Sequence, residues 1–247
     1  MNTILQNICD CHVHFGQFAH NYHSAKSVQK AIDNIGIQRA CVMPTGYFSK
    51  KEFFECLSAL KSFPAEKYDS FLWLSPRILR WMPIENLYKL HNFKAIKIHF
   101  VAHPDWYNNQ NKIHEIAEFA RRKKVPIMFH TGDYPFCEPH IFEPFCKEHP
   151  QTTFILAHAR PVNQTIAIME KYSNAWTDTA FTPIEDVTNL VKHDLSDRIL
   201  WGTDFPIFSQ NAEPQKIYRE RVKLFQNSMP SEEFEKIMWK NYKQLFV

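Results

Sequence analysis

Short apolar runs alternate with amphipathic helical patterns along the whole chain, and this alternation limits the fold more than any other feature. Each apolar run has the length and the β-branched or aromatic content of a strand, and a helix candidate follows it. The eight strand candidates are QNICDCH, RACVMP, DSFLWLSP, FKAIKIH, VPIMFH, TTFILAH, NAWTDT and RILWGTD. Such alternation is typical of βαβ units around a parallel sheet. Eight units predict an α/β fold closed into a single (β/α)8 TIM barrel, with a doubly wound open sheet as the alternative.

Length and composition agree with one barrel. The chain has 247 residues, the typical size of one α/β barrel, so we expect one domain over residues 1–247. Its net charge is only +3, so we expect neither nucleic acid nor a membrane as a partner. Neither of the glycine-rich motifs for dinucleotides and for P-loop phosphates occurs, which excludes those functions. The N-terminus lacks the pattern of a signal peptide, so we expect a cytoplasmic protein with a small-molecule substrate, either monomeric or a homo-oligomer.

Ionisable side chains lie at the ends of four strand candidates, at positions His12, His14, His130, His158 and Asp204. Because the carboxyl ends of barrel strands meet at one rim, these side chains predict a metal site there. Strand alternation places His12 and His14 on one face together with Asp10, and Cys9 on the opposite face. The His-x-His pair carries little weight alone, since 13 histidines predict about 0.7 such pairs by chance. The agreement among the four strands carries the prediction.

Six motifs in this order resemble the amidohydrolase superfamily, in the branch of aminocarboxymuconate-semialdehyde decarboxylase-like metal-dependent enzymes. They are DCHVH, KAIKIH, PIMFHTG, FILAHAR, RILWGTDFP and the terminal IMWKNYKQLF. The resemblance covers nearly the whole chain and also implies a (β/α)8 barrel. It implies one divalent ion held by His12, His14, His130 and Asp204, with His158 as a catalytic group. Zinc is the favoured ion, manganese or another divalent ion is the alternative, and a second ion is less favoured.

The implied ligands suit a hydrolytic centre. Neutral imidazoles and one carboxylate leave a divalent ion with an open position, at which water is acidified near neutral pH. Asp204 is then also catalytic, because its carboxylate can accept the proton of the water and deliver it to the leaving group. His158 would polarise a carbonyl or stabilise an oxyanion.

Three further residues are candidates for substrate binding. Lys97 and His99 share one face of the fourth strand, and Arg160 follows His158. Lys97 or Arg160 could anchor a substrate carboxylate, although a surface salt bridge would also explain Arg160. In other branches of the superfamily a carboxylated lysine bridges two ions, which in this chain would make Lys97 a metal ligand. Asp178, at the end of the seventh strand, could orient a ligand or cap a helix.

We therefore expect a metal-dependent hydrolase of a small amide, lactone or ester that uses metal-activated water. The alternative is a decarboxylase, a carbon–carbon lyase acting on a small carboxylic acid, aromatic acids included. The resemblance favours hydrolysis, because decarboxylases of this branch usually carry insertions after the early strands. The first three βα units of this chain are too short to contain them. A non-enzymatic binding scaffold is a third alternative. Aromatic residues of the loops after strands are expected either to line a pocket or to pack as a lid: Phe15, Phe18, Tyr22, Trp106, Tyr107, Tyr134, Phe136, Phe205 and Phe208.

Overall fold

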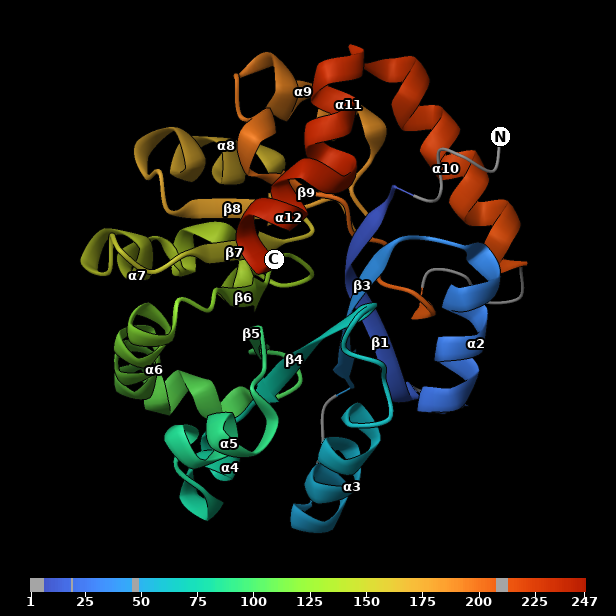
Figure 1. Cartoon of the computed structure of the whole chain (residues 1–247). Coiled ribbons are helices and arrows are strands. Elements are labelled where there is room, and N and C mark those ends of the chain that lie inside the picture. The colour runs from blue at the N-terminus through green and yellow to red at the C-terminus, as the bar shows by residue number, and fades with distance from the viewer. Residues whose placement is uncertain (1–6, 19, 46–48, 208–212) are drawn as a thin grey trace.

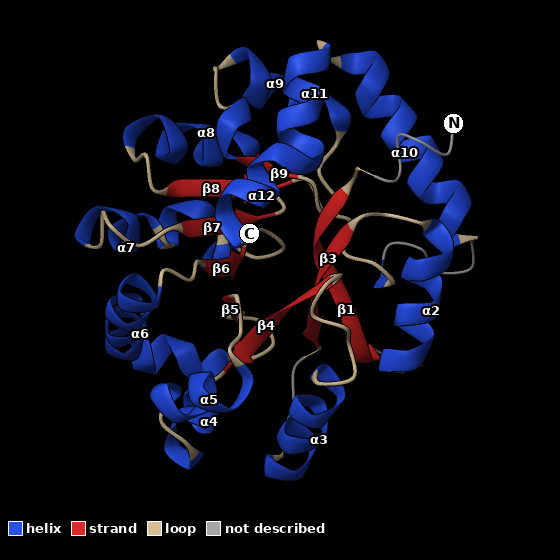
Figure 2. Ribbon diagram, viewed as in Figure 1, coloured by secondary structure: helices blue, strands red, loops and turns tan. Residues whose placement is uncertain are grey.

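A curled nine-stranded sheet forms the centre of the molecule (Figures 1 and 2). The computed structural model describes residues 7–18, 20–45, 49–207 and 213–247. The strand order is β2-β1-β3-β4-β5-β6-β7-β8-β9, and every pair except β1 with β2 is parallel. The strands are β1 (Cys9–Phe18), β2 (Asn21–His23), β3 (Arg39–Pro44), β4 (Tyr68–Leu74), β5 (Ala95–Ile98), β6 (Ile127–His130), β7 (Phe154–Ala157), β8 (Ala175–Asp178) and β9 (Ile199–Leu200). All eight expected strands are present, and the hairpin strand β2 was not predicted.

Helices surround the outer side of the sheet, and the C-terminal helix lies across the middle of the view (Figure 1). The α-helices are α2 (Ala25–Ile35), α3 (Lys50–Leu60), α4 (Pro76–Trp81), α5 (Ile84–His91), α6 (Gln110–Lys123), α7 (Glu143–Glu148), α8 (Val162–Lys171), α9 (Ile184–Lys192), α10 (Pro214–Ser228), α11 (Ser231–Glu235) and α12 (Asn241–Phe246). Shorter helical segments are η1 (Pro104–Asn109), η2 (Pro135–Cys137), η3 (Pro139–Ile141), η4 (Ser196–Arg198) and the π-helical η6 (Lys236–Lys240). Among the described residues, no helix is long and apolar enough to cross a membrane.

Local sequence signals explain where several helices begin and end. Helix α2 ends at Gly36, whose φ of 83° lies in the left-handed region that glycine adopts without a Cβ clash. Helix α3 begins at Ser49, which exchanges hydrogen bonds with Glu52 in a capping box. Helix α6 ends with three basic side chains in its last turn, which complement the helix dipole. These signals fix the lengths of the units that alternate with the strands.

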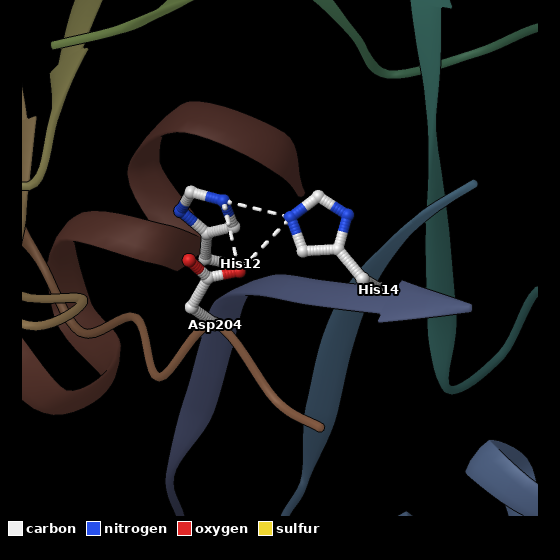
Figure 3. Close-up of side chains that lie close together, drawn as sticks. All are labelled: His12, His14 and Asp204. Carbon is white, nitrogen blue, oxygen red and sulfur yellow. Dashed lines mark hydrogen bonds and ion pairs between the residues drawn. The ribbon is translucent and has the colours of Figure 1, made fainter. Parts of the chain in front are cut away.

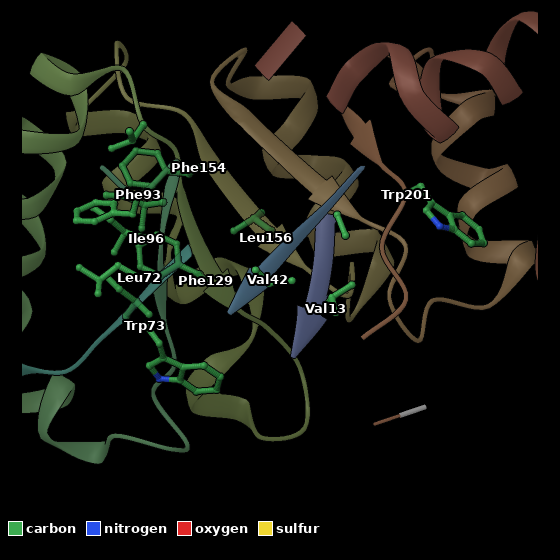
Figure 4. Close-up of a cluster of buried hydrophobic side chains, with 14 of the residues drawn as sticks. Val13, Val42, Leu72, Trp73, Phe93, Ile96, Phe129, Phe154, Leu156 and Trp201 are labelled. Atoms are coloured by element: carbon green, nitrogen blue, oxygen red, sulfur yellow. The ribbon is translucent and has the colours of Figure 1, made fainter. Parts of the chain in front are cut away.

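Two groups of buried apolar side chains fill the two faces of the sheet. The larger group lies between the strands and the surrounding helices and includes Val42, Leu72 and Phe129 (Figure 4). The smaller group collects the alternate positions of the strands, such as Met43 and Ile155, together with Tyr242 and Phe246 of the C-terminal helix. Alternation of side chains along each strand therefore buries both faces, as in a sheet that is covered by helices and curls around its own interior.

The chain that follows β9 returns to β1 through backbone hydrogen bonds. The N–H of Cys11 donates to the carbonyl of Trp201 at 2.9 Å, and the N–H of Asp204 donates to the carbonyl of His12 at 2.8 Å. The N–H of His14 donates to the carbonyl of Phe205 at 2.6 Å. The first strand and the segment that carries Asp204 are therefore held side by side.

A β-bulge in β1 overturns one expectation about its faces. Asp10 pairs with Ala40 and His14 pairs with Met43, so β1 has one more residue than β3 between the two pairs. Because laterally paired residues share a face, Asp10 faces the helix side with Ala40, whereas His14 faces the sheet interior with Met43. The expectation that Asp10 shares the face of the two histidines was therefore wrong, whereas Cys9 does lie on the face opposite Asp10, in the interior group. The extra residue shifts the alternation by one.

Candidate metal centre

His12, His14 and Asp204 form a compact group of potential metal ligands (Figure 3). His14 Nε2 lies 3.1 Å from His12 Nε2 and 3.0 Å from Asp204 Oδ1, and His12 Nε2 lies 3.7 Å from Asp204 Oδ1. All three residues are buried. Apart from these two imidazole nitrogens, Asp204 Oδ1 has no hydrogen-bond partner in the described part of the chain, although it is buried. A divalent cation is the group that three converging nitrogen and oxygen atoms of this kind fit best.

His12 is oriented by a second carboxylate. Its Nδ1 donates to Asp178 Oδ2 at 2.7 Å, which leaves the lone pair of Nε2 facing His14 and Asp204. The other oxygen of Asp178 accepts the backbone N–H groups of His158 and Ala180 at 3.0 and 2.9 Å. The structure thus places Asp178 against a candidate ligand, as in the orienting alternative from the sequence. His12, His158 and Asp178 also form a second group of atoms close enough for a metal ion.

Two residues in the segments that follow β7 and β9 adopt left-handed backbone conformations. The φ of His158 is 73° and that of Asp204 is 61°, in a region where non-glycine residues are uncommon. Such a conformation costs on the order of 1–3 kcal/mol and persists only where the surroundings fix it. Gly202 supports this arrangement, since a Cβ there would come within 3.0 Å of His12 Cβ and 3.3 Å of Asp178 Cβ.

His130 lies beside His158, outside the compact group. Its Nδ1 is 3.1 Å from His158 Nε2, and its Nε2 donates to Asp133 Oδ2 at 2.8 Å. The structure therefore brings His12, His14 and Asp204 together and joins His130 to them through His158. The contact of Asp133 escaped sequence reasoning, because this residue lies in a turn and is part-exposed.

The candidate substrate-binding residues occupy three different positions. Lys97 is buried, and its Nζ lies 3.4 Å from His12 Nε2. His99 is stacked between Trp73 and His130, with ring centroids 5.3 and 3.8 Å apart, and its Nδ1 accepts the N–H of Ala102. Both residues are therefore next to the candidate ligands, with Lys97 closest to His12.

Arg160 forms an ion pair with Asp133 at the wall of an open pocket of about 280 Å³. Arg160 Nη2 lies 3.1 Å from Asp133 Oδ1. Tyr134 and Glu138 also line the pocket. The backbone permits this because Gly132 has no side chain: a Cβ there would come within 2.8 Å of Arg160 Cβ. The salt bridge expected as one explanation of Arg160 is thus present. Its partner Asp133 also contacts His130, which places the ion pair next to the candidate centre.

Burial controls the protonation of the centre. Burial lowers the pKa of His14 to about 4 although Asp204 opposes it, and burial together with His130 lowers the pKa of His158 well below 6.5. Burial alone would raise the pKa of Asp204, but the adjacent His12 and His14 hold it well below its usual value. Burial lowers the pKa of Lys97 to about 8, against the attraction of Asp178 and Asp204. Near neutral pH His14 is therefore neutral and Asp204 is ionised, as ligands of a cation must be, and His158 is neutral as well.

The aromatic residues expected near the rim differ in exposure. Phe15, Trp106 and Phe205 are buried packing residues, Phe18 is half-buried, and Tyr22, Tyr107, Tyr134 and Phe136 are exposed. Tyr134 and Phe136 stack with ring centroids 5.2 Å apart, and Tyr134 lines the pocket. Phe208 lies outside the described residues. Phe181, which the sequence did not indicate, is 40% exposed and lies 6.2 Å from the ring of His158.

Comparisons with known proteins identify relatives at the level of family and fold. A family model described as amidohydrolase matches residues 78–246, a range that includes His130, His158 and Asp204 and excludes β1. No curated protein matches the sequence.

Solved structures resemble the chain over almost its full length. A probable 2-pyrone-4,6-dicarboxylic acid hydrolase from Acinetobacter baumannii with bound citric acid has a TM-score of 0.70 at 13% identity, covering 97% of this chain and 99% of that one. A zinc-bound amidohydrolase from Burkholderia multivorans has a TM-score of 0.70 at 8% identity, covering 97% and 98%. A 2,6-dihydroxybenzoate decarboxylase in complex with 2,6-dihydroxybenzoate has a TM-score of 0.66 at 13% identity, covering 98% of each chain. At these identities the likeness concerns the fold.

Proposed function

Because the chain belongs to the amidohydrolase family of enzymes, we propose that it is a metal-dependent hydrolase of a small amide, lactone or ester. The observation that carries this proposal is the buried group of His12, His14 and Asp204, in which Asp204 Oδ1 has no partner among the described residues besides the two imidazole nitrogens, and Asp178 orients His12. We propose one divalent ion, zinc, held by these three residues with His130 as a fourth ligand. Such an ion supplies a positive charge that polarises a carbonyl oxygen and lowers the pKa of water.

The protein side chains would divide the proton transfers between them. Asp204 stays ionised at neutral pH, so its second carboxylate oxygen can accept a proton from water and pass it to a leaving group. His158 donates its Nδ1–H to the carbonyl of Ala180 at 3.1 Å, so the neutral ring has a lone pair at Nε2. His158 can therefore accept a proton at Nε2. Only after this uptake can it donate a hydrogen bond from Nε2 to an oxyanion.

Three residues would bind the substrate. Lys97 supplies a buried cation next to His12, and His99 stands beside it at the end of the fourth barrel strand. Arg160 presents a guanidinium in the adjacent pocket, where it could bind a carboxylate in two-point contact. Together with the exposed rings of Tyr134 and Phe136, these charges favour a small, flat, acidic substrate.

We further propose that the sheet closes into one (β/α)8 barrel over residues 1–247, with the metal centre at the carboxyl ends of its strands. The backbone hydrogen bonds from β1 to Trp201, Asp204 and Phe205 support this closure. So does the position of His130 and Asp178 as the last residues of β6 and β8.

The second candidate function is decarboxylation of a small aromatic acid. It is favoured by the likeness to the 2,6-dihydroxybenzoate decarboxylase, which covers both chains equally. The same ligands and the same neighbouring histidine would serve this reaction, so product analysis has to separate the two.

A substrate panel of lactones, amides, esters and aromatic carboxylic acids tests the proposal. The zinc-loaded protein should hydrolyse at least one of the first three classes, and His158→Asn should lower kcat about 100-fold or more. Carbon dioxide release is followed in parallel. Release from the aromatic acids without any hydrolysis would replace the hydrolase proposal by the decarboxylase.

A further inference from the structure

A buried carboxylate on the helix side of β1 touches the backbone of the candidate centre from behind. Asp10 is fully buried, and its Oδ1 accepts the N–H of His12 at 2.9 Å and the N–H of Thr203 at 3.2 Å. Its Oδ2 accepts the hydroxyl of Thr203 and the hydroxyl of Tyr218, each at 2.6 Å. One side chain thus joins β1, the segment after β9 and helix α10.

Hydrogen bonds also fix the residues directly before and after Asp204 in the sequence. Thr203, the residue before it, is held by Asp10 through its N–H and its hydroxyl. Phe205, the residue after it, donates its N–H to Thr203 Oγ1 at 3.1 Å, and Asp204 itself donates its N–H to the carbonyl of His12. The left-handed φ of 61° at Asp204 lies within this set of bonds. Surroundings of this kind are what keep a strained backbone conformation in place.

We propose that Asp10, Thr203 and Tyr218, together called the Asp10 network, are positioning residues that hold His12 and Asp204 at the spacing a metal ion requires. The inference rests on the proposed metal centre. Tyr218 is the distant member: it lies on α10 and is fully buried, and its hydroxyl is 2.6 Å from Asp10 and 3.0 Å from Thr203. Asp10 itself faces the helices, away from the side on which His14 and the interior group lie.

Tyr242 offers a matched control for Tyr218. It too is a buried tyrosine whose hydroxyl donates to a buried aspartate, Asp69 Oδ2, at 2.7 Å. Its ring belongs to the apolar group of the sheet interior with Phe246. Tyr218→Phe and Tyr242→Phe therefore remove chemically equal groups, one from the Asp10 network and one outside it.

The test compares these variants in the cobalt-substituted and metal-free protein. Tyr218→Phe should weaken Co²⁺ binding about tenfold and change the visible absorption of the bound ion, since partners behind the ligands typically control affinity by 10–100-fold. It should also speed hydrogen exchange at the amides of Thr203 and Phe205 in the metal-free protein. Tyr242→Phe should leave the Co²⁺ affinity, the spectrum and this exchange unchanged.

The hydroxyl of Thr203 provides a second pair of variants. Thr203→Val should reproduce the changes of Tyr218→Phe, and Thr203→Ser, which retains the hydroxyl, should restore wild-type affinity and spectrum. Equal affinities, spectra and exchange rates in Tyr218→Phe and wild type would overturn the inference, as would equal effects of Tyr242→Phe.

Co²⁺ binding by the wild type separates this inference from the proposed function. Absence of Co²⁺ binding by the wild type would refute the metal centre and, with it, the positioning role of the Asp10 network. If the wild type binds Co²⁺ and the Tyr218→Phe readouts are unchanged, only the positioning role is refuted.

Discussion

Asp178 contacts both His12 and the backbone of His158. One of its oxygens accepts from His12 Nδ1 and the other from the backbone N–H of His158. Burial would raise its pKa, but His12, His158 and Lys97 together hold it well below the usual value. It therefore remains an acceptor at neutral pH and fixes which nitrogen of His12 faces the ligand group.

Asp178→Asn should weaken Zn²⁺ binding by about 10–100-fold. The amide retains one oxygen for the two backbone N–H groups, but its NH2 then faces His12 Nδ1. This favours the imidazole tautomer with its proton on Nε2, where the metal would bind. Competition with a chromophoric chelator measures the affinity. Glu185→Gln, which removes an exposed carboxylate from α9, should bind zinc as the wild type does, and an Asp178→Asn affinity within twofold of wild type would contradict the assigned orientation.

At the residue scale, sequence reasoning found what strand ends can reveal. His12, His14 and Asp204 do converge: the two histidines lie within β1, and backbone hydrogen bonds hold the segment after β9, which carries Asp204, beside them. Asp133 and Tyr218 escaped it: one reaches His130 from a turn, and the other reaches Asp10 from a helix 208 residues away. The contact of Tyr218 depends on how α10 packs against β1, and the contact of Asp133 depends on how the three residues after β6 bend back toward His130.

At the scale of elements, the positions of the strands could be predicted from the sequence, but the face of the sheet to which each residue of β1 points could not. The eight strands were predicted because apolar runs of the right length alternate with amphipathic helices. The bulge in β1 was not, because a single extra residue leaves no mark in the pattern CDCHVH. Its effect is large: it turns Asp10 toward Tyr218 while His14 faces the interior. The hairpin strand β2 has only three residues and pairs with β1 alone, too little for a periodic signal.

For the whole molecule, stability should fall in acid because several buried histidines are neutral in the folded state. His103 is such a residue away from the compact group. It is buried, its ring lies edge-on to Trp73, and burial lowers its pKa to about 4 although Asp105 opposes this shift. An unfolded histidine has a pKa near 6.5, so the unfolded chain binds this proton first as the pH falls. The contribution of His103 is therefore complete above pH 6.5 and is lost as the pH falls from 6.5 toward 4.

His103→Gln should flatten this dependence. Between pH 7 and pH 5 the wild type should lose about 2 kcal/mol more free energy of unfolding than the variant, from the one proton that His103 takes up on unfolding. Urea titrations at the two pH values give both differences. A variant that loses as much stability as the wild type over this range would show that His103 does not titrate on unfolding.

The binding of one zinc ion by His12, His14 and Asp204 is the central claim, and titration of the metal-free protein with Zn²⁺ tests it most directly. We expect one ion per chain in the wild type, binding at least tenfold weaker in Asp204→Asn, and an unchanged single site in His114→Gln. That last variant removes the contact of 2.9 Å between His114 Nδ1 on α6 and His149 Nε2 after α7, a close histidine pair away from the candidate centre at which zinc could also bind. A wild type that takes up no ion, or an Asp204→Asn variant that binds zinc as tightly as the wild type, would contradict the account.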